Sequence, residues 1–105
     1  MTCINAVELQ KRMQSGQAIH LLDVREAIEF HTYNIGGINI PLSKLSGALP
    51  LAHFTQTDEI IVICKVGLRS KTAQSILLDN GYLHTFNLEG GLLALQKLNK
   101  YPALP

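Results

Sequence analysis

The feature that most constrains the fold is a run of four β-branched residues, Ile60–Ile63, between polar segments. Because successive residues of a strand point to opposite faces of a sheet, a strand that is apolar at every position is buried on both faces. Such strands are typical of the centre of a parallel sheet that is covered by helices. The run therefore predicts an α/β fold in which residues 60–63 form a central strand.

The segments on either side alternate between strand patterns and helix patterns, which favours a mainly parallel sheet with helices on both faces. Other strands are expected at residues 18–23, ending at Asp23, at 38–40 and at 85–88. Helices are expected from Ala6 to about Met13 with Asn5 as cap, over residues 25–31, weakly over 43–54, from Lys71 to about Asn80 with Ser70 as cap, and from Gly90-Gly91 onward. The 105 residues show no repeat or linker, so we predict one domain over residues 1–105.

Charge and composition exclude several classes of protein. A net charge of +1 argues against nucleic-acid binding, and no apolar run approaches the roughly 18 residues of a membrane span. The first residues lack a secretory signal and the chain holds only two cysteines, so we expect a cytoplasmic protein with free thiols. Cys3 is expected to be a small buried residue or part of a frayed terminus. No metal-ligand spacing or cofactor motif is present, so neither is expected.

Cys64 follows the predicted central strand directly, at the edge of the sheet where ligands bind in such folds. The loop after it, CKVGLRS, carries Lys65 and Arg69, and nearby cations favour a thiolate. Gly67 permits a turn that aims backbone N–H groups inward as an anion site, next to the start of a helix. We interpret Cys64 as a nucleophile and the loop as its anion cradle, formed by Lys65, Val66, Gly67, Leu68 and Arg69. The alternative is a structural strand-end cysteine followed by an ordinary polar loop.

Three polar residues are expected to support this loop. Asp23 and Arg25 lie at another strand end, where Asp23 would bond loop backbone and Arg25 would tie neighbouring elements together. A catalytic carboxylate is the alternative, although attack by a preformed thiolate needs no general base. Ser70 is expected to cap the following helix. Arg69 either pairs with an internal carboxylate or carbonyl and closes the loop, or binds an anionic substrate directly.

Four separated motifs resemble those of the rhodanese family, the single-domain thiosulfate sulfurtransferases. CKVGLRS resembles the family's active-site loop, Cys-x-x-Gly-x-Arg-Ser, and LLDVRE at residues 21–26 resembles its first signature. YNIGGINIPL at 33–42 and NLEGGLLAL at 87–95 resemble two further motifs. The chain departs from the pattern at Asn34, where the family usually has histidine, and at Leu95, where tryptophan is common.

The resemblance implies a three-layer sandwich with a central five-stranded parallel sheet. It also implies that Cys64 accepts a sulfane sulfur from thiosulfate or a similar small anionic donor and passes it, from a persulfide, to cyanide or a thiol. Lys65 would attract the donor. One alternative is a persulfide carrier or regulatory module that acts with a sulfur-trafficking protein. Another is a phosphatase or arsenate reductase of related fold, but such phosphatases have a loop one residue longer between cysteine and arginine.

Overall fold

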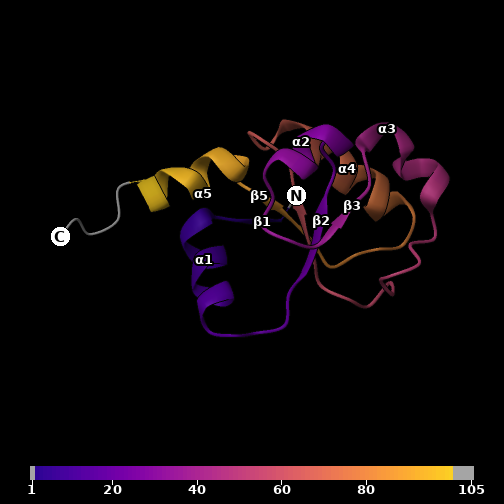
Figure 1. Cartoon of the computed structure of the whole chain (residues 1–105). Coiled ribbons are helices and arrows are strands. Elements are labelled where there is room, and N and C mark those ends of the chain that lie inside the picture. Colours follow the sequence, from indigo (N-terminus) through magenta and orange to yellow (C-terminus); the bar gives the residue numbers. More distant parts are fainter. Residues whose placement is uncertain (1, 101–105) are drawn as a thin grey trace.

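One parallel sheet organises the part of the chain that this computed structural model describes, residues 2–100 (Figure 1). Within that part its five strands lie in the order β1-β5-β4-β2-β3, and every neighbouring pair is parallel. The strands are β1 (Cys3–Ile4), β2 (His20–Asp23), β3 (Ile38–Asn39), β4 (Ile60–Ile63) and β5 (Thr85–Leu88). All four residues of β4 are fully buried in the middle of the sheet. The predicted α/β class with a five-stranded parallel sheet is therefore confirmed.

Helices cover both faces of the sheet, and the alternation along β4 sets the two cores. Ile61 and Ile63 pack against α1 (Ala6–Gln14) and α5 (Gly91–Lys100). Ile60 and Val62 face the opposite core, which includes residues of α3 (Leu42–Leu45) and α4 (Leu68–Asp79). The remaining helices are α2 (Ala27–Thr32) and the 3-10 turn η1 (Ser46–Ala48). Figure 1 shows α1 beside α5 and α3 beside α4, as expected for a three-layer sandwich.

Local sequence signals account for most of these elements. The side chain of Asn5 accepts a hydrogen bond from the Glu8 backbone N–H (2.8 Å), so the predicted cap of α1 is confirmed. Strand β2 ends at Asp23 and β5 spans residues 85–88, both as predicted. The weak helix expected over residues 43–54 is divided into α3 and η1, and it ends before Pro50.

The expectation for Cys3 is wrong. Cys3 is exposed and lies in strand β1, opposite Asn87 of β5, so it is neither buried nor part of a frayed terminus. Two residues are too few for an apolar alternation, which explains why the sequence did not indicate this strand.

The parallel arrangement brings the carboxyl ends of the strands to one edge. Asp23, Asn39 and Leu88 end three of the strands there, and Cys64 follows β4 at the same edge. Between residues 2 and 100, none of the helices combines the length and apolar character that crossing a bilayer demands.

Candidate active site

The loop at residues 64–70 wraps around the sulfur of Cys64. The backbone N–H of Gly67 donates to Sγ at 3.0 Å and that of Ser70 donates at 3.4 Å. Gly67 has φ +95°, a left-handed conformation that favours glycine, and it turns the chain into α4. An added Cβ there would lie 3.2 Å from the Gly90 nitrogen, so the loop also packs closely on the next motif. These N–H groups form the cradle of the site.

The predicted helix cap at Ser70 is wrong. Helix α4 begins three residues earlier than expected, at Leu68, with Gly67 as its cap residue. Ser70 therefore belongs to the first turn of α4 and is fully buried. Its hydroxyl lies 3.3 Å from Sγ of Cys64, where it is one of the polar groups around the sulfur.

Hydrogen-bond donors, more than nearby cations, set the ionisation of Cys64. Burial raises the pKa of this fully enclosed thiol, but the Ser70 hydroxyl and the backbone N–H groups of Ser70, Gly67 and Val66 lower it by more. The net result is a lowered pKa. The sequence predicted that the loop cations, the helix start and the backbone N–H groups together stabilise a thiolate. The largest lowering contributions come from the Ser70 hydroxyl, which was not predicted, and from the backbone N–H groups, which were.

Arg69 pairs with the carboxylate of Glu29, which the sequence does not indicate as its partner. Its guanidinium binds Glu29 of α2 in a bidentate arrangement, with N–O distances of 2.6 and 3.0 Å. Glu29 also accepts a hydrogen bond from the Glu26 backbone, as the third-position residue of a capping box. Of the two alternatives for Arg69, the structure shows the carboxylate pair, which ties the loop to α2. The spacing of Glu26 and Glu29 fits a capping box and so places Glu29 at the start of α2, but it does not indicate Arg69 as its partner.

The Arg69–Glu29 pair predicts a pH dependence of stability. Hydrogen bonds from Arg69, opposed by partial burial, lower the pKa of Glu29 from 4.5 to about 2. Because the unfolded chain takes up this proton first, the pair stabilises the fold fully above about pH 4.5 and is lost as pH falls through about 2. Urea unfolding between pH 2 and 6 should show a flatter stability curve for Glu29→Gln than for the unmodified protein. Arg69→Leu should flatten it by a large part of that amount, because the Glu26 backbone N–H still lowers the Glu29 pKa. The double variant should flatten it no further than Glu29→Gln; an additive effect would contradict the pairing.

Asp23 and Arg25 form a buried pair at the end of β2. Arg25 binds the Asp23 carboxylate through Nε and Nη2, with Nη2 at 2.8 Å, and donates to the carbonyls of Glu29 and Tyr33. The backbone N–H of Arg25 also donates to Asp23 Oδ1. The side-chain amide of Asn39 donates to the backbone carbonyls of Asp23 and Arg25. The arrangement links β2, β3 and α2 and directs the Asp23 carboxylate to Arg25 rather than to Cys64.

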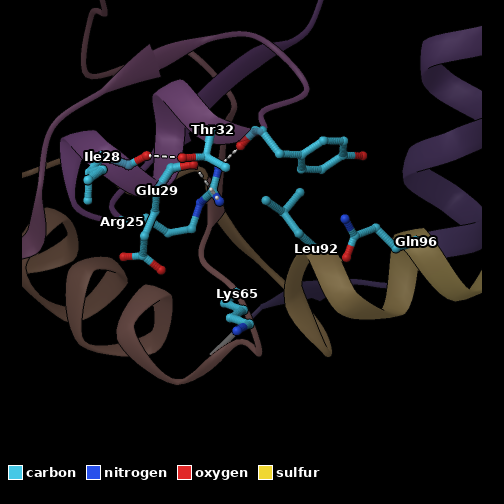
Figure 2. A pocket seen from close by; sticks show the side chains of 8 residues that line it. Arg25, Ile28, Glu29, Thr32, Lys65, Leu92 and Gln96 are labelled. Atoms are coloured by element: carbon cyan, nitrogen blue, oxygen red, sulfur yellow. Dashed lines mark hydrogen bonds between the residues drawn. The ribbon is translucent and has the colours of Figure 1, made fainter.

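A cavity of about 300 Å³ adjoins the loop (Figure 2). Figure 2 shows Lys65 entering from the loop, Leu92 and Gln96 from α5, and the rest of the labelled side chains from the α2 side. Lys65 is exposed at this cavity, directly after the buried Cys64. Val66 and Leu68 are also exposed, so three of the five predicted cradle side chains face outward while the backbone N–H groups face the sulfur. The cavity is lined by Arg25, Ile28, Glu29, Thr32, Tyr33, Lys65, Leu92 and Gln96.

The start of α5 holds the loop from the other side. The backbone N–H of Leu92 donates to the Cys64 carbonyl at 2.9 Å, and that of Leu93 donates to the Lys65 carbonyl at 3.0 Å. Together these contacts define a class of α/β domain in which a cysteine at the end of a central parallel strand is held in a backbone anion cradle.

Comparison with known proteins identifies the family. The family model described as "Rhodanese-like domain" matches residues 5–98, and the chain belongs to that family. The chain is 34% identical over 74 residues to the thiosulfate sulfurtransferase PspE of Escherichia coli, covering 70% of this chain and 71% of that protein. It superimposes on the human single domain sulfurtransferase TSTD1 with a TM-score of 0.81 at 25% identity, covering 92% and 96% of the two chains.

Larger proteins also contain a similar segment. The chain is 32% identical over 91 residues to the protein named "Probable adenylyltransferase/sulfurtransferase MoeZ" of Mycobacterium tuberculosis, covering 86% of this chain. It spans only 23% of that protein's length. The same kind of domain therefore occurs alone and as one part of longer chains.

Proposed function

We propose that the protein is a sulfurtransferase that moves a sulfane sulfur from thiosulfate or a similar anionic donor to a nucleophilic acceptor through a persulfide on Cys64. The observation that carries this proposal is the position of Sγ, which accepts hydrogen bonds from the Gly67 and Ser70 N–H groups and has a lowered pKa. The names of PspE and TSTD1 support the same reaction class.

The reaction balances with one cysteine. The Cys64 thiolate attacks the outer sulfur of thiosulfate, the sulfur–sulfur bond of the donor breaks, and sulfite leaves with the electron pair. The outer sulfur is then a persulfide anion on Cys64, which the backbone N–H groups of the cradle stabilise. An acceptor such as cyanide or a thiol attacks that outer sulfur, and Cys64 leaves as the thiolate. No external oxidant or reductant is consumed, and Asp23 and Arg25 serve only to hold the neighbouring β2–α2 corner.

Turnover and mass measurements test this proposal directly. The purified protein should form thiocyanate from thiosulfate and cyanide, with ping-pong kinetics. Incubation with thiosulfate alone should add the mass of one sulfur atom to the peptide that contains Cys64. Absence of both the turnover and the adduct would reject thiosulfate as donor.

Lys65 provides a further test of the donor's charge. Its ammonium is exposed at the cavity beside the nucleophile, so Lys65→Ala should raise KM for thiosulfate by up to about fivefold, the effect expected from losing an exposed ion pair. An uncharged sulfane donor should be used almost as well as by the unmodified protein. Lys71→Ala, which removes an exposed charge from α4, is the matched control. Equal losses with charged and uncharged donors would exclude an electrostatic role for Lys65.

A second candidate is a persulfide carrier that receives sulfur from a protein partner. The observation that favours it is the exposure of apolar side chains near the loop: Ile28 is 77% exposed, Leu68 67% and Val66 45%. A relative from Bacillus subtilis is named "Putative sulfur carrier protein YrkF", and this chain spans 48% of its length. A persulfide that forms with a cysteine desulfurase but not with thiosulfate would support the carrier. Either role requires a reduced Cys64, in keeping with the predicted cytoplasmic location.

A further inference from the structure

A buried amide on β5 contacts two residues of the cradle. Asn87 is 1% exposed, and its Oδ1 accepts a short hydrogen bond from the Ser70 hydroxyl. Its Nδ2 donates to the carbonyl of Gly67 at 3.3 Å. The backbone N–H groups of Ser70 and Gly67 also donate to Cys64 Sγ. The side chain of Asn87 therefore hydrogen-bonds two of the residues that hold the sulfur.

The orientation of Asn87 follows from its partners. The Gly67 carbonyl can only accept a hydrogen bond, so the NH₂ group of Asn87 must face it and Oδ1 must face Ser70. Oδ1 can also only accept, and the hydroxyl has a single proton. That proton consequently points to Asn87, and Ser70 Oγ presents its lone pairs to Cys64 Sγ at 3.3 Å.

This arrangement suits a neutral thiol. When the Ser70 hydroxyl donates to Asn87 Oδ1, the S–H of Cys64 can donate to Ser70 Oγ. Each polar group in the hydrogen-bonded series Cys64–Ser70–Asn87 then has a partner. A thiolate can only accept, so the hydroxyl must rotate its proton toward the sulfur. Rotation leaves Asn87 Oδ1 without a donor in a buried site, which is costly.

We propose that Asn87 is a positioning residue that holds the Ser70 proton away from Cys64 and keeps the resting sulfur protonated over a wider pH range. The hydroxyl turns to the sulfur only when the sulfur becomes anionic. The inference rests on the proposed function for the identity of Cys64 as the nucleophile. The direction of the expected change separates this role from a purely structural one. Removing Asn87 should lower the pKa of Cys64.

The charged groups on the elements around Cys64 stay the same when Asn87 is substituted. Lys65 belongs to the loop, Asp23 ends β2 and pairs with Arg25 just after it, and Arg69 of α4 pairs with Glu29 of α2. Glu89 follows β5 at the start of the glycine pair. Substitution at Asn87 changes none of these charges, so a shift in the ionisation of Cys64 would come from the hydroxyl.

The experiment is a titration of the Cys64 thiol, followed by its alkylation rate as a function of pH. A Cys3→Ser background leaves Cys64 as the only thiol. Asn87→Leu removes the acceptor and keeps the branched shape of the side chain, and we expect it to lower the thiol pKa by about one unit, a tenfold change in the acid dissociation constant. Ser70→Ala should raise the pKa. The double variant should titrate like Ser70→Ala, because Asn87 acts through the hydroxyl.

The possible results separate the proposal from its alternatives. An unchanged or raised pKa in Asn87→Leu would overturn it, because looser packing of the Gly67 carbonyl should weaken the cradle and raise the pKa. Additive shifts in the double variant would also overturn it. Asn87→Val, a good strand former, is the second variant if Asn87→Leu unfolds. The titration needs no sulfur donor, so it is independent of whether the protein transfers sulfur, which the mass measurement tests without altering Asn87.

Discussion

Cys64→Ser is expected to abolish sulfur transfer from thiosulfate, with a loss of at least about a thousandfold, as found when a covalent nucleophile is removed. A serine hydroxyl at neutral pH carries almost no negative charge and cannot form the sulfur–sulfur bond of the persulfide. The hydroxyl remains close to the N–H groups of Gly67 and Ser70, which can still donate to it. Thiocyanate formation and the mass of the peptide after thiosulfate treatment are the measurements.

The fold of this variant should survive, because oxygen replaces sulfur in a site that already provides polar partners. The urea midpoint should therefore stay close to that of the unmodified protein. Cys3→Ser is the control: Cys3 is exposed on β1 and should not be needed for transfer. If Cys64→Ser kept its activity while Cys3→Ser lost it, the assignment of the nucleophile would be wrong.

The parts of the site that sequence could predict are those encoded within a few consecutive residues. The apolar run at residues 60–63 identifies the central strand, and Cys64 after it identifies the edge of the sheet. Gly67 indicates a tight turn, and the N–H groups of such a turn point inward whatever the neighbouring side chains are. The cradle therefore follows from local backbone geometry.

The partners of the loop could not be predicted, because they come from other parts of the chain. Glu29 and Asn87 lie 40 and 17 residues from the groups that they bind, Arg69 and Ser70. Whether Glu29 and Asn87 reach these partners depends on how α2 and β5 pack beside α4. The same packing turned Ser70 inward, where it contacts the sulfur instead of capping the helix. The sequence predicted the backbone N–H groups around Cys64 but not the Ser70 hydroxyl, which makes the largest contribution that lowers the pKa of Cys64.

Gly91→Ala is expected to cause a large loss of stability although it adds only one methyl group. Gly91 has φ +61°, and an added Cβ would lie 2.4 Å from the Lys65 carbonyl carbon and oxygen and 2.6 Å from the Cys64 carbonyl oxygen. These are backbone atoms, so no side-chain rotation can relieve the contact. The start of α5 would have to move away from the loop and lengthen the bonds from Leu92 and Leu93.

A matched control separates the stability cost of the left-handed conformation from that of the steric contact. Gly16 has a similar φ of +74°, but an added Cβ there meets nothing within 4 Å. Gly16→Ala should therefore cost about 1–2 kcal/mol from the backbone conformation alone. Gly91→Ala should cost more than about 3 kcal/mol, the sum of that conformational cost and a steric term of the size found for overpacked sites. Urea unfolding at neutral pH measures both variants.

Activity distinguishes a general loss of stability from a change at the site. In conditions where Gly91→Ala is still folded, its transfer rate should fall at least about tenfold, because a small displacement of positioned groups slows catalysis. Gly16→Ala, at the far end of α1, should transfer sulfur normally. Similar stability losses in the two variants would show that α5 accommodates the methyl group without moving the loop. The cradle would then be held by α4 and the Arg69–Glu29 pair rather than by the close approach of α5 to Cys64 and Lys65.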